Sequence, residues 1–315
     1  MKRWVSIIVP IGVLALAIFL FRDQLGFVRR GLSELAAASW WLIICGFACS
    51  LASLYAMSAV QRVLFTATGV RVSAGESFSL TMSANAWSTT FPGGAAFSTA
   101  YQYSQQRRWG ATALAIGWYI IFSATLSTVW LIAIAMSTLA LTGMSVANFS
   151  VGPLLLTGFF LLVVSLILYL VSVKHPKLAQ IQLAPLPFVT AAGWSLANWL
   201  LDIAALWLCL SALDIHPSIV AVFAAYAVAK IVGTVQVTPG GLGPVEAAMI
   251  AALSTAGITS STAVGAVFAY RLVSFVAITV TGWVLYGIRS FRTEPDPAAT
   301  EPVGGGPELP PAQAS

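Results

Sequence analysis

The feature that most constrains the fold is a series of long apolar runs that contain almost no charge. A helix needs roughly 20 apolar residues to cross a bilayer, and candidate runs occupy residues 4–21, 40–62, 111–142, 151–173, 188–211 and 261–288. Of the 315 residues, 59% are hydrophobic and 8% are charged, whereas soluble domains carry about 25% charged residues. The sequence therefore predicts an all-α polytopic membrane protein with about six spanning helices.

Two further stretches, 76–106 and 218–256, are apolar or rich in hydroxyl side chains but are interrupted by Pro-Gly-Gly. The interrupting residues are Pro92, Gly93 and Gly94 in the first stretch, and Pro239, Gly240, Gly241 and Gly243 in the second. Backbone freed by such a break cannot face lipid, so it is buried in protein or lines a water-filled cavity. We predict that each stretch forms a re-entrant helical hairpin; the alternative is eight full spans.

The two interrupted stretches occupy matching places in the sequence. Pro92 and Pro239 are 147 residues apart, and the segments TATGV at 66–70 and SALDI at 211–215 are 145 residues apart. Each stretch also follows a tryptophan-containing span and precedes a span with paired aromatic residues. We therefore predict an internal duplication, with repeat units over about 40–142 and about 188–289.

Basic residues orient the chain, because Lys and Arg favour cytoplasmic loops. Lys2 and Arg3 predict a cytoplasmic N-terminus, and Arg289 and Arg292 a cytoplasmic C-terminus. The hairpins must then enter from opposite sides, which makes the halves an inverted repeat of the kind seen in transporters with broken helices. We expect a multi-pass protein of the cell (plasma) membrane, with one transmembrane domain over 1–290 and a disordered cytoplasmic tail over 291–315.

Four charged residues fall inside the predicted membrane zone, where charge is costly and usually faces a partner or a cavity. They are two acids, Asp202 and Glu246, and two bases, Lys230 and Arg271, so internal pairing is expected. Asn198 lies one helical turn before Asp202 on the same face. The candidate residues for binding a charged or zwitterionic head group are these five together with Asn85 of the first interrupted stretch.

Each candidate also has a purely structural interpretation. If Pro244 is the first residue of a helix, Glu246 is the third, where a carboxylate favours the helix N-terminus; a cap and a substrate-facing carboxylate look alike in sequence. Arg271 would bridge packed helices, for example by pairing with Asp202, and Lys230 would extend its ammonium toward the membrane surface. The hydroxyl side chains before the first break would repair freed backbone.

Familiar catalytic and nucleic-acid-binding patterns are missing from the sequence. It contains no HExxH, GxSxG or P-loop motif and no TVGYG filter, and its basic residues form no stripe. We therefore expect no catalytic residue, metal, cofactor or nucleic-acid partner.

The segment TPGGLGPVEAAMI resembles the signature of the lysylphosphatidylglycerol synthase transmembrane-region family, also called the UPF0104 membrane proteins. The matching positions are Pro239, Gly240, Gly241, Gly243 and Glu246, with Asn85, Pro92 and Gly93 in the first half and Arg271 in the following span. Relatives often continue the first motif with arginine and glutamate, where this chain has PGGAAFSTAY. The resemblance covers roughly residues 5–290.

The resemblance implies a flippase-like membrane module, which in bifunctional members moves an aminoacylated phospholipid between leaflets. We see no counterpart of their aminoacyl-transferase domain and expect no lysyl-phosphatidylglycerol synthesis. The expected substrate is a polar-headed lipid: a phospholipid, an aminoacyl-phospholipid, or a polyprenyl- or hopanoid-linked lipid. One alternative is a membrane module that assists a separate lipid- or glycan-modifying synthase; another is an intramembrane transferase with Glu246 or Asp202 as base.

Overall fold

The computed structural model describes residues 35–142 and 185–292, apart from positions 37, 92 and 234–238, together with the single residues 159 and 163. The expected spans at 4–21 and 151–173, Pro92 and the tail from residue 293 onward lie outside the described residues.

Four helical stretches in the described ranges are long and apolar enough to cross a membrane. They are α3 (Trp40–Ala67), α6 (Ala113–Thr142), α8 (Pro185–Ala212) and a continuous run made of α11 (Ser260–Arg271), the π-helix η5 (Leu272–Ala277) and α12 (Ile278–Arg292). These stretches confirm the four spans predicted there. The first is longer than expected, because Arg62 stays exposed and the helix continues past it to Ala67.

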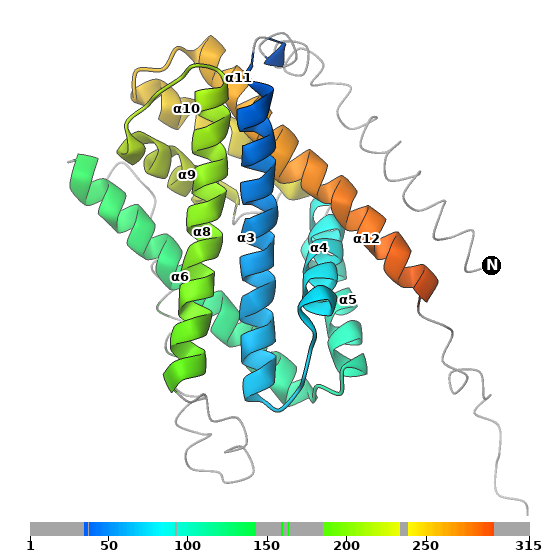
Figure 1. The fold of residues 1–315 in the computed structure, drawn as a ribbon. Helices are drawn as coiled ribbons and strands as arrows, with labels where there is room; N and C mark the ends of the chain where they lie inside the picture. Colours follow the sequence, from blue (N-terminus) through cyan, green and yellow to red (C-terminus); the bar gives the residue numbers. More distant parts are fainter. Residues whose placement is uncertain are drawn as a thin grey trace, which may run out of the picture.

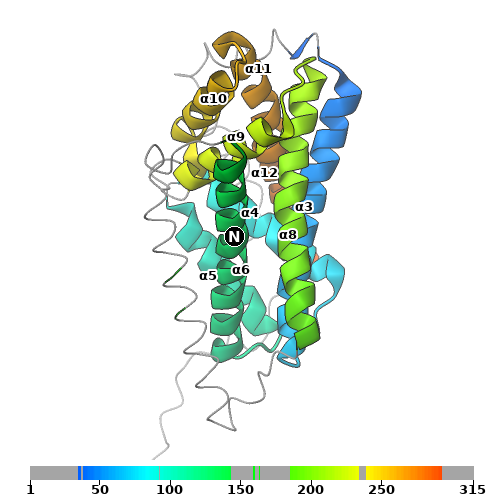
Figure 2. The same ribbon diagram turned by 90° about the vertical axis from the view of Figure 1, so that its left-hand side faces the viewer.

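Helices α3 and α8 pack side by side along their length (Figures 1 and 2). Each has 28 residues, and both end in a turn of the same type. In these two turns Gly69 and Asp214 take left-handed φ angles of 84° and 58°. The N–H of the residue that follows each of them donates to the carbonyl five residues earlier. Gly69 and Asp214 are 145 residues apart, the offset seen in the sequence.

Each interrupted stretch forms a pair of short helices that pack against each other. The first pair is α4 (Ala74–Thr90) and α5 (Gly94–Arg108); the second is α9 (Ile219–Gly233) and α10 (Pro244–Thr255), with the 3-10 turn η4 (Pro239–Gly241) before α10. These helices have 12 to 17 residues, below the roughly 20 of a spanning helix. That length argues against eight full spans.

The two halves run in opposite directions along the molecule (Figure 1). Helix α3 descends, and the α4–α5 pair is entered and left at the lower end, by the loops at 68–73 and 109–112. Helix α8 ascends, and the α9–α10 pair is entered and left at the upper end, by the loops at 213–218 and 256–259. This order favours an inverted duplication, which stays a prediction, as does the re-entrant course of each pair.

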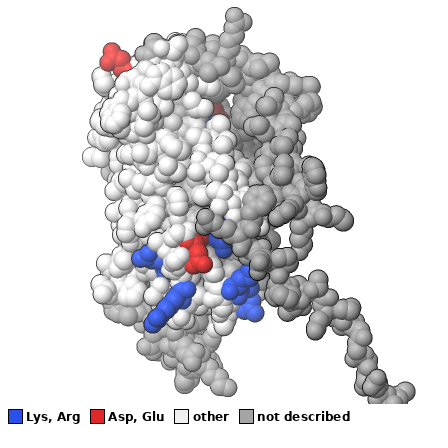
Figure 3. Space-filling view, turned by 45° about the vertical axis from the view of Figure 1, so that its right-hand side comes forward, with Lys and Arg blue, Asp and Glu red and all other residues white. Residues whose placement is uncertain are grey.

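Charge also separates the two ends. On the face shown in Figure 3, basic side chains gather at the lower end around an acidic residue, and another acidic residue lies at the upper end. The upper loop between α8 and α9 carries Asp214. The lower end carries the ends of α3, α5 and α12 with Arg62, Arg71, Arg107, Arg108 and Arg289. By the positive-inside rule the lower end is the expected cytoplasmic side.

Helix α12 packs closely on α4. A Cβ added at Gly282 would lie 2.4 Å from the carbonyl oxygen of Met82, so the glycine allows the two backbones to approach. Thr89 and Thr279 are hydrogen-bonded at 2.9 Å, and the Trp283 indole donates to Thr90 at 3.0 Å. The first broken pair is therefore joined to the last span of the second half.

Candidate functional site

The four charged residues predicted inside the membrane zone form two ion pairs. Lys230 Nζ on α9 lies 2.8 Å from Asp202 Oδ2 on α8, and Arg271 Nε at the end of α11 contacts Glu246 Oε1 on α10. The expected internal pairing is confirmed. The alternative of an Asp202–Arg271 pair is wrong, because Arg271 is engaged by Glu246 and Asp202 by Lys230.

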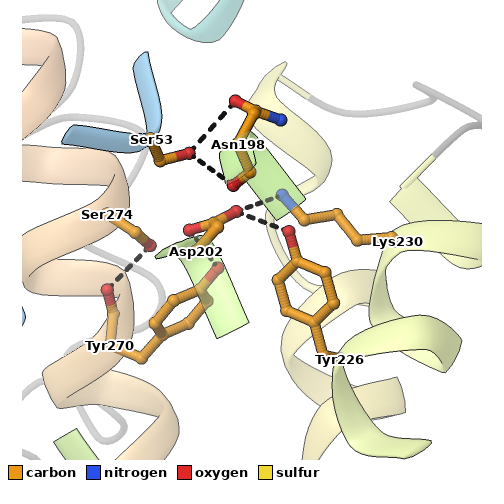
Figure 4. Close-up of polar contacts among 7 residues, drawn as sticks. All are labelled: Ser53, Asn198, Asp202, Tyr226, Lys230, Tyr270 and Ser274. Atoms are coloured by element: carbon orange, nitrogen blue, oxygen red, sulfur yellow. Dashed lines mark hydrogen bonds and ion pairs between the residues drawn. The ribbon is translucent and has the colours of Figure 1, made fainter. Parts of the chain in front are cut away.

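Two tyrosines complete the surroundings of Asp202 (Figure 4). Tyr226 on α9 donates its hydroxyl to Asp202 Oδ2 at 2.7 Å, and Tyr270 on α11 donates to Oδ1 at 3.0 Å. The carboxylate thus accepts from three donors on two neighbouring helices, as a charged group in a low-dielectric setting requires. Both tyrosines are buried.

Lys230 is the accessible member of its pair. Its side chain is 39% exposed, against 15% for Asp202, and its ammonium lies 5.0 Å from the centre of the Tyr226 ring and 5.9 Å from that of Trp199. Lys230 therefore turns inward to a carboxylate and two aromatic faces, where the sequence had allowed it to extend toward the membrane surface.

Asn198 lies one turn before Asp202, as predicted, and joins α8 to α3. Ser53 Oγ on α3 donates to the Asn198 carbonyl at 2.9 Å and contacts Asn198 Oδ1 at 3.1 Å (Figure 4). The polar region around Asp202 thereby takes side chains from α3, α8, α9 and α11.

Glu246 caps its own helix and also pairs with Arg271. Pro244 is the first residue of α10, as expected, and Glu246 Oε2 accepts from the Gly243 N–H at 2.6 Å, which caps the helix. The other oxygen, Oε1, pairs with Arg271. A contact with substrate stays a prediction.

Arg271 also holds the turn between the two short helices. Its Nη2 donates to the Gly240 carbonyl at 3.0 Å, and its guanidinium lies 4.7 Å from the centre of the Phe275 ring. Phe275 belongs to the π-helix that begins directly after Arg271, and π-helical turns are frequent at functional sites. A Cβ added at Gly240 would lie 2.1 Å from Phe275 Cε2, so this break needs glycine at that position.

Asn85 is separate from the other candidates. It is half-buried on α4, and its carbonyl accepts from Thr89 Oγ1 at 2.9 Å. Within the described ranges, no hydrogen bond links its side chain to either ion pair. The hydroxyls of Thr89 and Thr90 bond back to α4 carbonyls, which favours the structural interpretation of this stretch. Even so, α4 contacts the η4 turn, so the two broken pairs lie close together.

Sequence reasoning missed Tyr226, Tyr270 and the π-helix. Tyr226 could have been found, because it lies four residues before Lys230 on one helix face. Tyr270 directly precedes Arg271, so consecutive residues of α11 reach the two acids of the site. No sequence pattern signals the π-helix.

These features define an all-α membrane protein with paired charges beside a broken helix pair. No group of three metal-ligating side chains occurs within the part of the chain that the structure describes, and the two balanced pairs are suited to binding ions or polar head groups.

The chain belongs to the family described as the lysylphosphatidylglycerol synthase TM region, whose model matches residues 7–282. It is similar to a UPF0104 membrane protein of Methanocaldococcus jannaschii, with 31% identity over 96 residues, which is 30% of this chain and 29% of the relative. It is also similar to one of Methanothermobacter thermautotrophicus, with 32% identity over 84 residues, or 27% and 25% of the two chains. The chain thus spans less than a third of the length of these relatives.

Proposed function

We propose that the protein moves a polar-headed lipid between the leaflets of the cell membrane, with the lower end of the molecule on the cytoplasmic side. The observation that carries the proposal is the position of the two ion pairs. In the broken pair, α9 carries Lys230 and α10 carries Glu246. Their partners are Asp202 on the flanking helix α8 and Arg271 on the flanking helix α11. Paired charges beside broken helices are typical of a polar path through a membrane protein.

The head group would bind beside these four charged side chains. Lys230 and Arg271 can bind a phosphate, and Asp202 and Glu246 can bind an amine. Because the acids and bases balance, the empty site is neutral, which lowers the cost of holding four charges in the membrane. Membership of a family named for a lipid synthase is consistent with a lipid substrate.

The test is a scrambling assay in proteoliposomes that contain short-chain fluorescent phospholipids. A membrane-impermeant quencher reaches only the outer leaflet, so lipid in the inner leaflet is quenched only after it has moved outward. We expect wild-type protein to expose lipid to the quencher, Glu246→Gln and Arg271→Ala to reduce the rate, and Asp214→Asn in the exposed upper loop to leave it unchanged. No lipid movement by purified wild-type protein would contradict the proposal. Co-purification with a synthase would then favour the assisting module.

A further inference from the structure

We infer that the Asp202–Lys230 pair is a proton-exchange site, at which binding of a phosphate group to Lys230 is linked to uptake of one proton by Asp202. This inference rests on the proposed function and deepens it, because it names the chemistry of the ligand and the means of coupling. In the empty site Lys230 neutralises Asp202. In the occupied site Lys230 pairs with the phosphate.

The exposure of the two residues sets the order of contact. An incoming ligand meets Lys230 first, because its side chain is 39% exposed while that of Asp202 is 15% exposed. Lysine carries its charge on a long flexible stem, so its ammonium can leave the carboxylate without movement of the backbone. Asp202 has a short side chain held by Tyr226 and Tyr270. The ligand that fits the accessible member is therefore an anion.

Charge balance then calls for a proton. A phosphate diester adds one negative charge to a neutral pair, and a buried carboxylate that has lost its counterion is more stable protonated. One O–H bond forms on Asp202 with a proton that the acid form of the buffer releases in bulk solvent, and Lys230 remains an ammonium. The site, ligand and proton together return to zero net charge.

The partners of Asp202 suit both protonation states. A tyrosine hydroxyl donates to a carboxylate and accepts from a protonated carboxyl, so the hydrogen bonds of Tyr226 and Tyr270 survive the exchange. Among the described residues, Lys230 on α9 and Cys209 on α8 itself also face this region, and the charge of Arg271 lies near Tyr270. Helix α3 presents Ser53 to Asn198, and the π-helix presents Ser274 to the Tyr270 carbonyl.

The second ion pair lacks this freedom. Glu246 also bonds the Gly243 N–H, and Arg271 also bonds the Gly240 carbonyl. Their side chains are 8% and 14% exposed. Separating them would disrupt the cap of α10 and the η4 turn, so exchange is assigned to Asp202 and Lys230.

The test is calorimetric titration of the purified full-length chain in detergent, in two buffers of different ionisation enthalpy at one pH. The probes are short-chain phosphatidylglycerol and inorganic phosphate. We expect about one proton taken up per ligand by wild type and by the exposed-loop control Asp214→Asn, and about none by Asp202→Asn, which also supplies the baseline for the ligand's own ionisation. Asp202→Asn should bind at least as tightly as wild type, because Lys230 is then free.

Binding without proton uptake in wild type, equal uptake in Asp202→Asn, or no binding of either probe would overturn the inference. Uptake with phosphatidylglycerol alone assigns the ligand to lipid, whereas equal uptake with inorganic phosphate supports the linkage and assigns it to a free anion. If Asp202→Asn does not fold, the double variant Asp202→Asn/Lys230→Gln removes both charges and must show neither binding nor uptake, and binding with unchanged proton uptake in it would overturn the inference.

Transport experiments separate this inference from the proposed function. If the rate of lipid movement does not change with an imposed pH gradient, the proton linkage is overturned and the lipid function is retained. If protons are taken up on binding but no lipid moves, the lipid function is overturned and the proton linkage is retained. Acceleration by the gradient in wild type, lost in Asp202→Asn, supports both.

Discussion

Asp202 and Glu246 are both acids paired with bases, yet their surroundings differ. Glu246 is bound to backbone through one oxygen and to Arg271 through the other. Among the described residues, Asp202 is bound by the side chains of Lys230 and of two tyrosines. A carboxylate held by backbone fixes a turn, whereas one held by side chains can exchange partners. The difference between a cap and a binding group is thus decided by individual partner atoms.

A first prediction concerns the ion pair of Glu246. The substitution Glu246→Gln leaves Arg271 without a counterion in a buried position, and we expect it to lower stability by about 3–5 kcal/mol. Glu76→Gln is a matched control, because Glu76 is the third residue of α4, caps it in the same way and is exposed. That variant should lose less than about 1 kcal/mol. Reversible unfolding in mixed micelles measures both; equal losses would mean that the ion pair contributes little.

At the scale of elements, glycines decide how closely the helices approach. Gly240 has a φ of 57° and lies against Phe275, whereas Gly257 after α10 has a φ of 88° and no neighbour near its missing Cβ. Gly282 lies against α4, whereas Gly287 on the same helix faces open space. Gly257 is therefore a control for Gly240, and Gly287 for Gly282, because each control glycine has a similar backbone conformation but no neighbouring atom near its missing Cβ.

The second prediction is that Gly240→Ala destabilises the protein more than Gly257→Ala. Both substitutions force a non-glycine residue into the left-handed region, at a cost of about 1–2 kcal/mol, but only Gly240→Ala also collides with Phe275. Adding Phe275→Ala should recover part of the loss in the Gly240→Ala protein, as measured by thermal unfolding in detergent. A lack of any recovery would show that the ring is not the obstacle.

The third prediction is that Gly282→Ala costs about 1–3 kcal/mol by overpacking the α4–α12 contact. Gly287→Ala should be neutral or stabilising by up to about 1 kcal/mol, because alanine favours helix. Chemical unfolding of the two single variants gives the comparison, and indistinguishable values would contradict the close approach of the two helices.

At the scale of the whole molecule, the lower end carries the positive charge and the two halves run in opposite directions (Figures 1 and 3). An inverted repeat brings its two broken pairs toward each other from opposite ends, and here α4 contacts the η4 turn. The paired charges all lie in the second half, while the first pair is fixed to α12 by hydroxyls. We expect the second pair to bind the ligand and the first to support it.

The fourth prediction is that the ends of α5 and α10–α11 lie on opposite sides of the membrane. Cysteines at the exposed positions Ser104 and Ser260, in a protein freed of its own three cysteines, should differ in labelling by an impermeant maleimide on intact cells. Ser104→Cys should react only after permeabilisation, and Ser260→Cys before it. Labelling of both from one side would contradict the inverted arrangement.

Local patterns allowed much of this to be predicted. Apolar length predicted the spans within the described ranges, Pro244 predicted the start of α10, and the scarcity of membrane charge selected Asp202, Lys230, Glu246 and Arg271. The partners of those charges could not be predicted: Asp202 contacts Lys230 and not Arg271. The bond from Tyr270 to Asp202 could not be predicted either, nor could the lack, within the described residues, of a hydrogen bond between the Asn85 side chain and either ion pair.

The sequence by itself determined which segments are helical, where they break and which residues carry charge, because these depend on side-chain polarity and on the backbone limits of proline and glycine. Only the tertiary structure decided which acid meets which base, since residues 25 or 28 positions apart are brought together by how helices pack. That packing divides the charges into a pair fixed to backbone and a pair free to exchange. Because the dielectric constant is low in the packed interior, each of these ion pairs has a large interaction energy.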